Sequence, residues 1–300
     1  MMKRRDKFAI REKVHVKEGR EAIYKKMRQY DAVVIWDLPA ELRNDFVKFC
    51  FSHSIRCYQT PKISDILIRG AERIHMFDTP LLLSRNTGLT IEQMFFKRLT
   101  DIVISALAII VTSPIMLVIA LCVKCYDGGP VFYKQERLTI GGKAFMIYKF
   151  RSMCVDSEKK GAQLAKKNDS RVTPVGRVIR NLHVDELPQL FNILKGDMSF
   201  IGPRPERPQI IREYMEEMPE FAYRMKVKAG LAGYAQVYGK YNTTPYDKLK
   251  LDLFYIENYS VWLDLKLMLL TLKILFTPDS TEGVDEKQVT AMKKQAREEE

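Results

Sequence analysis

The chain has 300 residues, which suits one domain of medium size with additions or two small domains. Hydrophobic residues make up 46% of the chain, enough for a substantial core, and the 29% of charged residues excludes neither a soluble nor a membrane-associated protein. The formal net charge of +12 favours anionic partners, namely nucleic acid, anionic lipid or phosphorylated substrates.

The five cysteines are too sparse for a disulfide-rich secreted scaffold, and the charged start MMKRRDKFAIREK lacks the apolar region of a cleavable signal peptide. We therefore expect a reducing, cytoplasmic environment. Cys122 and Cys125 have CxxC spacing, but no second Cys or His pair accompanies them. A zinc site needs about four ligands, so this spacing alone does not indicate a metal.

The first predicted region, residues 1–93, contains a fragment of an α/β fold and a connector. The pattern predicts a buried strand over 32–36, a helix that begins at Pro39, and a second strand over 54–60. This order is typical of part of a doubly wound, Rossmann-like domain, but no Gly-x-Gly-x-x-Gly loop is present. A docking or regulatory module is therefore favoured over nucleotide binding.

Residues 102–123 carry no charged side chain and, at about 1.5 Å per residue, could cross a bilayer as one helix. Ser113 and Pro114 lie in the middle of this run. A proline inside a helix removes a backbone hydrogen bond, and each half of the run is too short to cross alone. Basic residues before and after the run favour both ends on the cytoplasmic side. We therefore favour a re-entrant helical hairpin over 94–127, with a straight spanning helix as the alternative.

Residues 128–276 are predicted to mix strands with helices. The last helical pattern could belong to a core helix or to an amphipathic helix at a membrane interface, and the hydrophobic hairpin upstream favours the interface. The predicted segments are two strands around Gly141-Gly142, a lysine-rich loop over 154–173, a short helix with Arg177 and Arg180, helices over 206–226 and 246–276, and a charged tail over 277–300.

Two adjacent acids, Asp185 and Glu186, precede an apolar helical pattern that ends at Gly196. Aspartate is among the best N-cap residues and glutamate in a first turn suits the helix dipole, so a structural role explains both acids. Adjacent residues on a helix point about 100° apart, so the two carboxylates would not share one proton and could perform two different tasks. The sequence pattern leaves both interpretations open, and His183 is expected to be structural.

Basic residues accompany these acids along the chain. Guanidinium groups match phosphate oxygens in pairs, and a helix N-terminus binds anions. Carboxylates, Mg²⁺ and arginines together are the usual equipment of phosphoryl transfer. This cluster suits a phosphate-rich substrate together with Mg²⁺, for which Asp185 and Glu186 are the candidate ligands. The basic residues in question are Lys149, Arg177, Arg180, Arg204 and Arg207.

Four segments between residues 94 and 276 resemble, in order, the monotopic phosphoglycosyl transferases, the bacterial sugar transferases that start surface-glycan assembly. The most specific feature is the long run around Asp185 combined with a Ser-Pro pair inside the hydrophobic segment. Residues 31–93 resemble the end of the extra α/β domain of the longer members, so the chain resembles a shortened long-form member. The segments are FFKRLTDIVISALAIIVTSPIMLVIA, VFYKQERLTIGGKAFMIYKFRSM, LHVDELPQLFNILKGDMSFIGPRP and GLAGYAQVYGK.

The resemblance implies a helix-rich, mixed α/β fold with a monotopic catalytic domain (128–276) at the cytoplasmic face of the bacterial inner membrane. It implies transfer of a sugar 1-phosphate from a UDP-sugar to polyprenyl (undecaprenyl) phosphate, with release of UMP, to initiate capsule, exopolysaccharide or O-antigen synthesis. Asp185 would form a covalent aspartyl phospho-sugar intermediate, and Glu186 would assist through Mg²⁺ or by activating the lipid phosphate. No nucleic acid is implied, and a homodimer is the remaining partner to consider.

The resemblance also implies contacts to the phosphates and the nucleotide. Lys240 stands where the family has an arginine, and a lysine keeps the charge but loses the bidentate fork. Ser113-Pro114 matches the family's membrane break. The implied substrate-binding residues are Lys149, Arg180, Pro203, Arg204, Pro205, Lys240 and Asp264, the last of which could instead support the site.

Two other functions remain. A non-enzymatic basic adaptor on anionic membranes would account for the charge of +12, although no RNP1 or zinc-finger motif supports nucleic-acid binding. A soluble metal-dependent hydrolase could use the same two acids, but the uncharged run over 102–123 argues against it. Release of UMP from UDP-sugars would distinguish the transferase from the adaptor.

Overall fold

The computed structural model describes residues 9–84, 88–155, 169–239 and 243–275. The chain forms two compact units, residues 1–65 and 66–300. Lys240, most of the lysine-rich loop and the charged tail lie outside the described residues.

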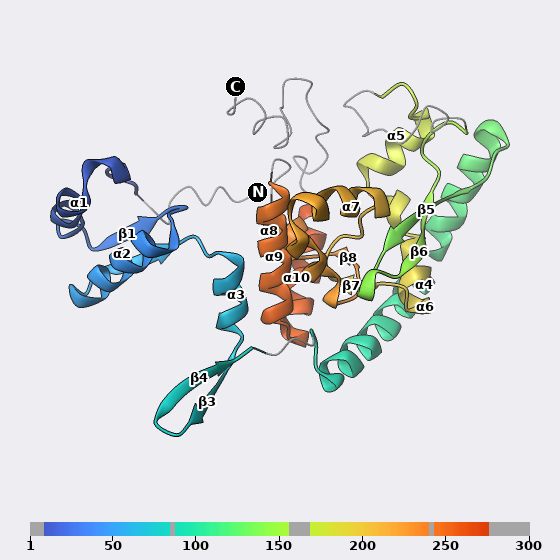
Figure 1. Ribbon diagram of the computed structural model, residues 1–300. Coiled ribbons are helices and arrows are strands. Elements are labelled where there is room, and N and C mark those ends of the chain that lie inside the picture. Colours follow the sequence, from blue (N-terminus) through green and yellow to red (C-terminus); the bar gives the residue numbers. More distant parts are fainter. Residues whose placement is uncertain (1–8, 85–87, 156–168, 240–242, 276–300) are drawn as a thin grey trace. The chain divides into compact units, whose positions relative to one another are not determined.

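The first unit contains the predicted strand–helix–strand order (Figure 1). Its two strands are parallel and pair from Ala32 with Arg56 to Ile35 with Gln59. Phe46 and Cys50 of the intervening helix are buried. The sheet has two strands among the described residues, so the helix and strands are confirmed, whereas a Rossmann-like fold is not. The elements are α1 (Arg20–Met27), β1 (Ala32–Ile35), α2 (Ala40–Ser52) and β2 (Arg56–Gln59), after a 3-10 turn η1 (Val16–Glu18).

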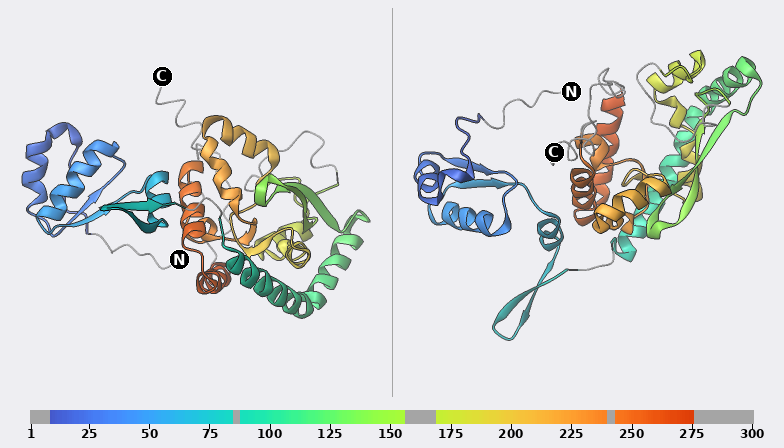
Figure 2. Two further views of the ribbon diagram at one scale, coloured as in Figure 1. Left: turned by 60° about the horizontal axis from the view of Figure 1, so that its bottom comes forward. Right: turned by 45° about the horizontal axis from the view of Figure 1, so that its top comes forward.

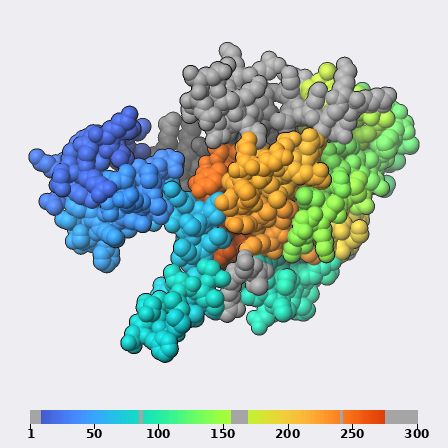
Figure 3. Space-filling model, viewed as in Figure 1, coloured from blue at the N-terminus to red at the C-terminus, as the bar shows by residue number. Residues whose placement is uncertain are grey.

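The second unit begins within α3 (Ile63–Arg69) and continues into a hairpin of β3 (Glu72–Met76) and β4 (Thr79–Leu83). The sequence predicted a connector here, because the segment lacks a clear alternation of polar and apolar residues. Every residue of β3 is exposed, and the hairpin projects from the surface (Figure 3).

The hydrophobic segment forms one continuous helix, α4 (Ile91–Asp127), with Pro114 inside it. Of the described helices it alone is long and apolar enough to cross a membrane. Figure 2 shows it bent between its two halves. Pro114 cannot donate to the carbonyl of Ile110, and the Ser113 hydroxyl donates to that oxygen instead at 2.9 Å. The predicted break is therefore a bend within one helix, and the re-entrant hairpin is not confirmed.

The rest of the unit is a helix-rich, mixed α/β arrangement, as predicted. β5 and β6 form an antiparallel hairpin, and β7 pairs in parallel with β8. The elements are β5 (Phe132–Leu138), η2 (Ile140–Gly142), β6 (Ala144–Phe150), α5 (Pro174–Asn181), η3 (Val184–Glu186), α6 (Gln189–Lys195), β7 (Ser199–Ile201), α7 (Pro208–Glu217), η4 (Pro219–Lys226), β8 (Gly230–Ala232), α8 (Tyr234–Tyr238), α9 (Pro245–Glu257) and α10 (Val261–Leu275).

Two long helices predicted from apolar spacing are each divided. The segment 206–226 consists of α7 and the 3-10 helix η4, which begins at Pro219. The segment 246–276 consists of α9 and α10, which are separated by Asn258, Tyr259 and Ser260. α9 is a core helix with Leu249, Leu253 and Tyr255 buried, whereas α10 exposes Trp262, Leu269 and Leu272. The interfacial prediction therefore suits the exposed face of α10 and not α9.

Candidate active site

The two adjacent acids lie in η3, a short turn between α5 and α6. His183 precedes the turn in the left-handed conformation (φ 55°). The N-cap of α6 is Pro188, and no side chain caps this helix. The alternative role of Asp185 as a helix N-cap is therefore wrong. Gly196 ends α6 with φ 98°, as the sequence predicted.

Apolar side chains on both sides of the acids hold this turn in place. Val184 and Leu187 pack against a core cluster that includes Ile119 of α4, Phe150 of β6 and Ile179 of α5. The turn is thus anchored to three elements while Asp185 and Glu186 remain partly exposed. This anchoring positions two acids at the junction of the hydrophobic helix and the β5–β6 hairpin.

Glu186 joins the three segments of the site. Its Oε1 accepts hydrogen bonds from Lys149 Nζ of β6 at 2.6 Å and from an Arg204 guanidinium nitrogen at 2.9 Å. Burial alone would raise the pKa of Glu186, but Arg204 and Lys149 outweigh burial and hold that pKa well below its usual range. The structure therefore brings together Glu186, Lys149 and Arg204, which were predicted from separate parts of the sequence.

Asp185 has a different environment from its neighbour. Burial raises the pKa of Asp185, and Glu186 adds to the effect, whereas Lys149 and Arg180 oppose it. Within the described residues the Asp185 carboxylate accepts no hydrogen bond. A partly exposed carboxylate that has no hydrogen-bond partner among the described residues and lies next to cationic groups can react at a phosphorus centre.

The Gly202-Pro203-Arg204-Pro205 turn is held by backbone contacts. Gly202 is needed because a Cβ there would lie 2.4 Å from the carbonyl oxygen of Lys228. The amide of Gly230 donates to the Pro203 carbonyl at 2.9 Å. Arg137 donates to the Pro205 carbonyl at 3.1 Å. The turn is therefore a rigid support from which Arg204 reaches Glu186.

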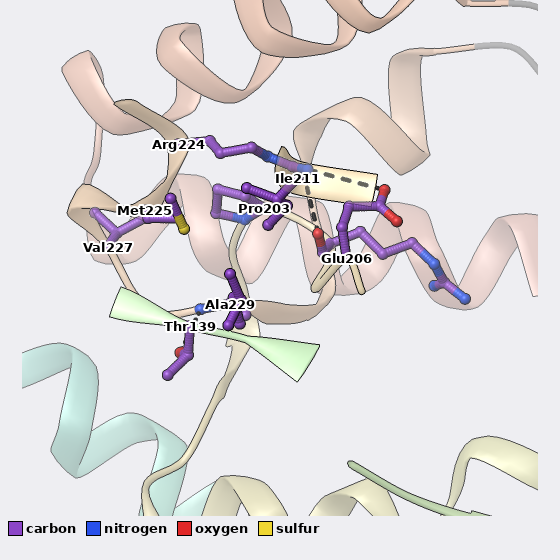
Figure 4. Close-up of a pocket in the computed structure, with 10 residues that line it drawn as sticks. Thr139, Pro203, Glu206, Ile211, Arg224, Met225, Val227 and Ala229 are labelled. Carbon is purple, nitrogen blue, oxygen red and sulfur yellow. Dashed lines mark hydrogen bonds and ion pairs between the residues drawn. The ribbon is translucent and has the colours of Figure 1, made fainter. Parts of the chain in front are cut away.

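A buried ion pair supports the turn from behind. Arg224 of η4 donates to the Arg204 carbonyl at 3.0 Å (Figure 4). It also pairs with Asp252 of α9 at 2.8 Å. Neither residue was predicted from the sequence, because the partners lie far apart along the chain and each falls within an ordinary helical pattern. The cavity in Figure 4, between Pro203 and Ile211, measures about 10 Å³ and has room for about one water molecule. It is too small for a sugar nucleotide.

The other predicted site residues do not join the hydrogen-bonded group of Glu186, Lys149 and Arg204. Arg180 is on α5 and makes no ion pair within the described residues. Asp264 of α10 is 5% exposed and pairs with Lys97 of α4 at 2.6 Å, so it supports the fold rather than lining the site as described. Lys240 lies outside the described residues.

The two acids fit a magnesium ion only with help from a substrate. No group of three or more His, Cys, Asp or Glu side chains suited to a metal is found in the part of the chain that the structure describes. Mg²⁺ is commonly held by one or two carboxylates together with water and substrate phosphates. Asp185 and Glu186 supply that donor set, since Glu186 Oε2 and both Asp185 oxygens accept no hydrogen bond from the described residues.

Comparison with known proteins adds independent information. Residues 92–278 match the model of the bacterial sugar transferase family. The chain is 40% identical over 260 residues to a UDP-N-acetylgalactosamine-undecaprenyl-phosphate N-acetylgalactosaminephosphotransferase of Aeromonas hydrophila, with 83% of this chain and 60% of the relative covered. It is 37% identical over 256 residues to a UDP-glucose:undecaprenyl-phosphate glucose-1-phosphate transferase of Klebsiella pneumoniae, with 84% of this chain and 53% of the relative covered.

A shorter relative is covered more fully. A putative undecaprenyl-phosphate N-acetylgalactosaminyl 1-phosphate transferase of Bacillus subtilis is 46% identical over 156 residues, which are 52% of this chain and 83% of that relative. The chain spans a little over half the length of the two longer relatives. The region matched by the family model contains α4, the acids and the Gly202-Pro203 turn.

Proposed function

Because the chain belongs to the bacterial sugar transferase family, we propose that it transfers a sugar 1-phosphate from a UDP-sugar to undecaprenyl phosphate and releases UMP. The observation that carries this proposal is the meeting of Glu186, Lys149 and Arg204 beside Asp185, which has no ion pair or hydrogen bond to its carboxylate in the described part of the chain. Two cations beside two acids suit a substrate that carries a diphosphate. The proposed product, a polyprenyl diphospho-sugar, would initiate a capsule, exopolysaccharide or O-antigen.

The proposed reaction has two displacements at one phosphorus atom. In the first, a carboxylate oxygen of Asp185 bonds to the phosphorus that carries the sugar, and the bond from that phosphorus to the bridging oxygen breaks. UMP leaves with the bridging oxygen and its electron pair. In the second, a phosphate oxygen of the lipid bonds to the same phosphorus. The bond from phosphorus to the Asp185 oxygen breaks, which restores the free carboxylate.

The neighbouring residues stabilise the charge that moves in these steps. Arg204 and Lys149, which now donate to Glu186, can donate to phosphate oxygens of the substrate instead. Arg180 adds a third cation next to Asp185. Mg²⁺ held by Asp185, Glu186 and the substrate phosphates would neutralise charge on the diphosphate. Glu186, whose pKa is depressed, remains an anion and orients the two cations before the substrate binds.

We also propose that α4 enters the membrane from the cytoplasmic face and returns to it. The bend at Pro114 and the exposed apolar side chains on both sides of it support this topology, as do the apolar residues on the surface of α10. The bent helix would then hold the site at the membrane surface, where the phosphate of a polyprenyl lipid lies.

Release of UMP tests the proposed function directly. Lipid-solubilised protein is incubated with Mg²⁺, undecaprenyl phosphate and a panel of UDP-sugars. We expect UMP release with at least one donor, and no turnover by Asp185→Asn. Glu213→Gln, which neutralises an exposed acid on α7, is the matched control and should keep full activity.

The covalent step has its own measurement. Without the lipid acceptor, the wild-type protein should release up to one equivalent of UMP and gain the mass of one phospho-sugar. Turnover by the Asp185→Asn protein would contradict the covalent mechanism. The rival adaptor function requires that no donor yields UMP while the protein still binds vesicles with anionic lipid.

A further inference from the structure

Arg98 and Asp101, near the start of α4, hydrogen-bond to the corner between α6 and β7, and we call these contacts the Arg98–Asp101 grip. This corner, residues 193–200, connects the two elements that flank the site, because Glu186 precedes α6 and Arg204 follows β7. Two side chains of α4, one helical turn apart, make the contacts: Arg98 holds the end of α6 and Asp101 holds β7. The hydrophobic helix is thus bonded directly to the segment that sets where the acids and Arg204 lie.

Arg98 completes the C-terminus of α6. Its guanidinium donates to the carbonyl oxygens of Ile193 and Leu194, each at 2.7 Å. The Ile193 carbonyl also accepts from the Gly196 amide at 3.0 Å. The last carbonyls of a helix carry partial negative charge, so a cation is favoured there. The contact is close, since a Cβ on Gly196 would lie 3.2 Å from an Arg98 nitrogen.

Asp101 completes the free edge of β7. The Ser199 amide donates toward β8, to the carbonyl of Ala229 at 2.8 Å, so the amide of the next residue points to the opposite side. Asp101 Oδ1 accepts from that amide, Phe200 N, and from the Ser199 hydroxyl, both at 3.0 Å. Asp101 is 4% exposed, and a buried amide without a partner would be costly.

Lys97 connects the same turn of α4 to the last residue of β7. It pairs with Asp264 at 2.6 Å and donates to the Tyr255 hydroxyl at 2.9 Å. That hydroxyl lies 3.1 Å from the carbonyl oxygen of Ile201, the last residue of β7. The strand that leads into the Pro203-Arg204 turn is therefore held near both of its ends by groups attached to α4.

We propose that Arg98 and Asp101 are positioning residues through which α4 sets the spacing between Glu186 and Arg204. The proposal rests on the proposed function, because its effect is read in the rate of sugar-phosphate transfer. α4 in this account is part of the active-site framework as well as a membrane element. Loss of the grip lets the α6–β7 corner shift, and a shift of about 1 Å can cost about 100-fold in rate.

Kinetics of the full chain test the proposal. Asp101→Ala and Arg98→Met should lower kcat for UMP release by about 10- to 100-fold, with a change in KM for the UDP-sugar of less than about threefold. Asp101→Asn should recover most of the rate, because both bonds end on Oδ1, which asparagine retains. Thr100→Ala removes a hydroxyl that donates to the Phe96 carbonyl of the same helix at 2.9 Å, so it is the control and its kcat should be unchanged. Full kcat in Asp101→Ala would overturn the proposal.

Two further measurements separate positioning from general damage. In a double-mutant cycle, Asp101→Ala should add little to the loss caused by Arg204→Ala, whereas fully multiplicative losses would contradict action through Arg204. Amide exchange in residues 196–204 should speed up in Asp101→Ala and, to a smaller extent, in Ser199→Ala. Unchanged exchange would contradict the grip. Exchange is measured without substrate, so it tests the grip even if the wild-type chain releases no UMP, the result that would refute the proposed function.

Discussion

At the scale of single residues, the pKa values of the two adjacent acids are shifted in opposite directions. Glu186 accepts from two cations and its pKa is lowered, whereas burial raises the pKa of Asp185. Separated pKa values in neighbouring acids indicate separate tasks, one as a permanent anion and one as the group that changes during the reaction. This division matches a nucleophile at Asp185 and an orienting, metal-binding group at Glu186.

Lys149 should be essential because it serves both acids. Lys149→Met removes one of the two donors to Glu186 and the largest favourable charge near Asp185. We expect kcat/KM for UMP release to fall by about 100- to 1000-fold, the loss typical of a group that stabilises transition-state charge. Lys134→Met, on the paired strand opposite Tyr148, removes an exposed lysine of the same hairpin and should retain activity. Equal activity of the two variants would contradict the role of Lys149.

The pH dependence of the donor reaction should report Asp185. The proposed nucleophile is the carboxylate, so kcat/KM should rise with pH through the raised pKa of Asp185 and level off above it. Arg180 favours the charged form, so Arg180→Met should move this acid limb to higher pH. Initial rates of UMP release over a pH series measure the limb. A limb that stays in place or moves to lower pH in Arg180→Met would count against the assignment.

The sequence pattern predicted the residues of the candidate site better than the residues that support them. Asp185, Glu186, Lys149 and Arg204 were predicted, and the last three meet within hydrogen-bonding distance. Arg224, Asp252 and Asp101 were missed. Their roles depend on which elements become neighbours in three dimensions, and a single sequence does not reveal such pairings.

At the scale of elements, periodicity located the helices but not their ends. Apolar spacing continues across Pro219 and across Asn258–Ser260, because neighbouring elements can share one buried face. The 3-10 turn at the acids was also missed, since Asp185 before an apolar run has the signature of an ordinary N-cap. The β3–β4 hairpin escaped prediction because all of β3 is exposed and it lacks an apolar face directed to a core.

The topology of α4 can be measured by cysteine labelling in membrane vesicles. In a background in which every other cysteine is replaced, Ile91→Cys marks the start of α4 and the native, exposed Cys125 marks its end. The proposed re-entrant path predicts labelling of both positions by an impermeant reagent from one side. Labelling from opposite sides would establish a spanning helix instead.

Pro114→Ala supplies the comparison for that measurement. An alanine restores the donor to the Ile110 carbonyl and favours a straight helix. We expect the label at one end of α4 to move to the opposite side in this variant. Ser113→Ala keeps the proline and should keep both labels on one side, at a cost of about 1 kcal/mol for the lost hydrogen bond.

At the scale of the whole molecule, the residues matched by the family model form only part of the second compact unit. The match begins at residue 92, inside the second unit, and includes every group assigned to the proposed reaction. The first unit has a core of its own around Phe46 and Cys50. Its strands and helix were predicted from sequence because they depend on local patterns. The docking or regulatory role favoured for them rests on the missing glycine-rich loop and stays a prediction.

This arrangement predicts that the first unit is dispensable for the chemistry. A chain that begins at Ile63 keeps α3 and the whole second unit and removes β1, α2 and β2. We expect it to release UMP with a kcat within about threefold of the full chain, because the groups proposed to contact the phosphates, the Arg98–Asp101 grip and α4 all remain. UMP release and thermal melting of both chains in the same lipid or detergent provide the measurement. A shortened chain that melts normally but has lost activity would show that the first unit contributes to catalysis, and the site proposed above would then be incomplete.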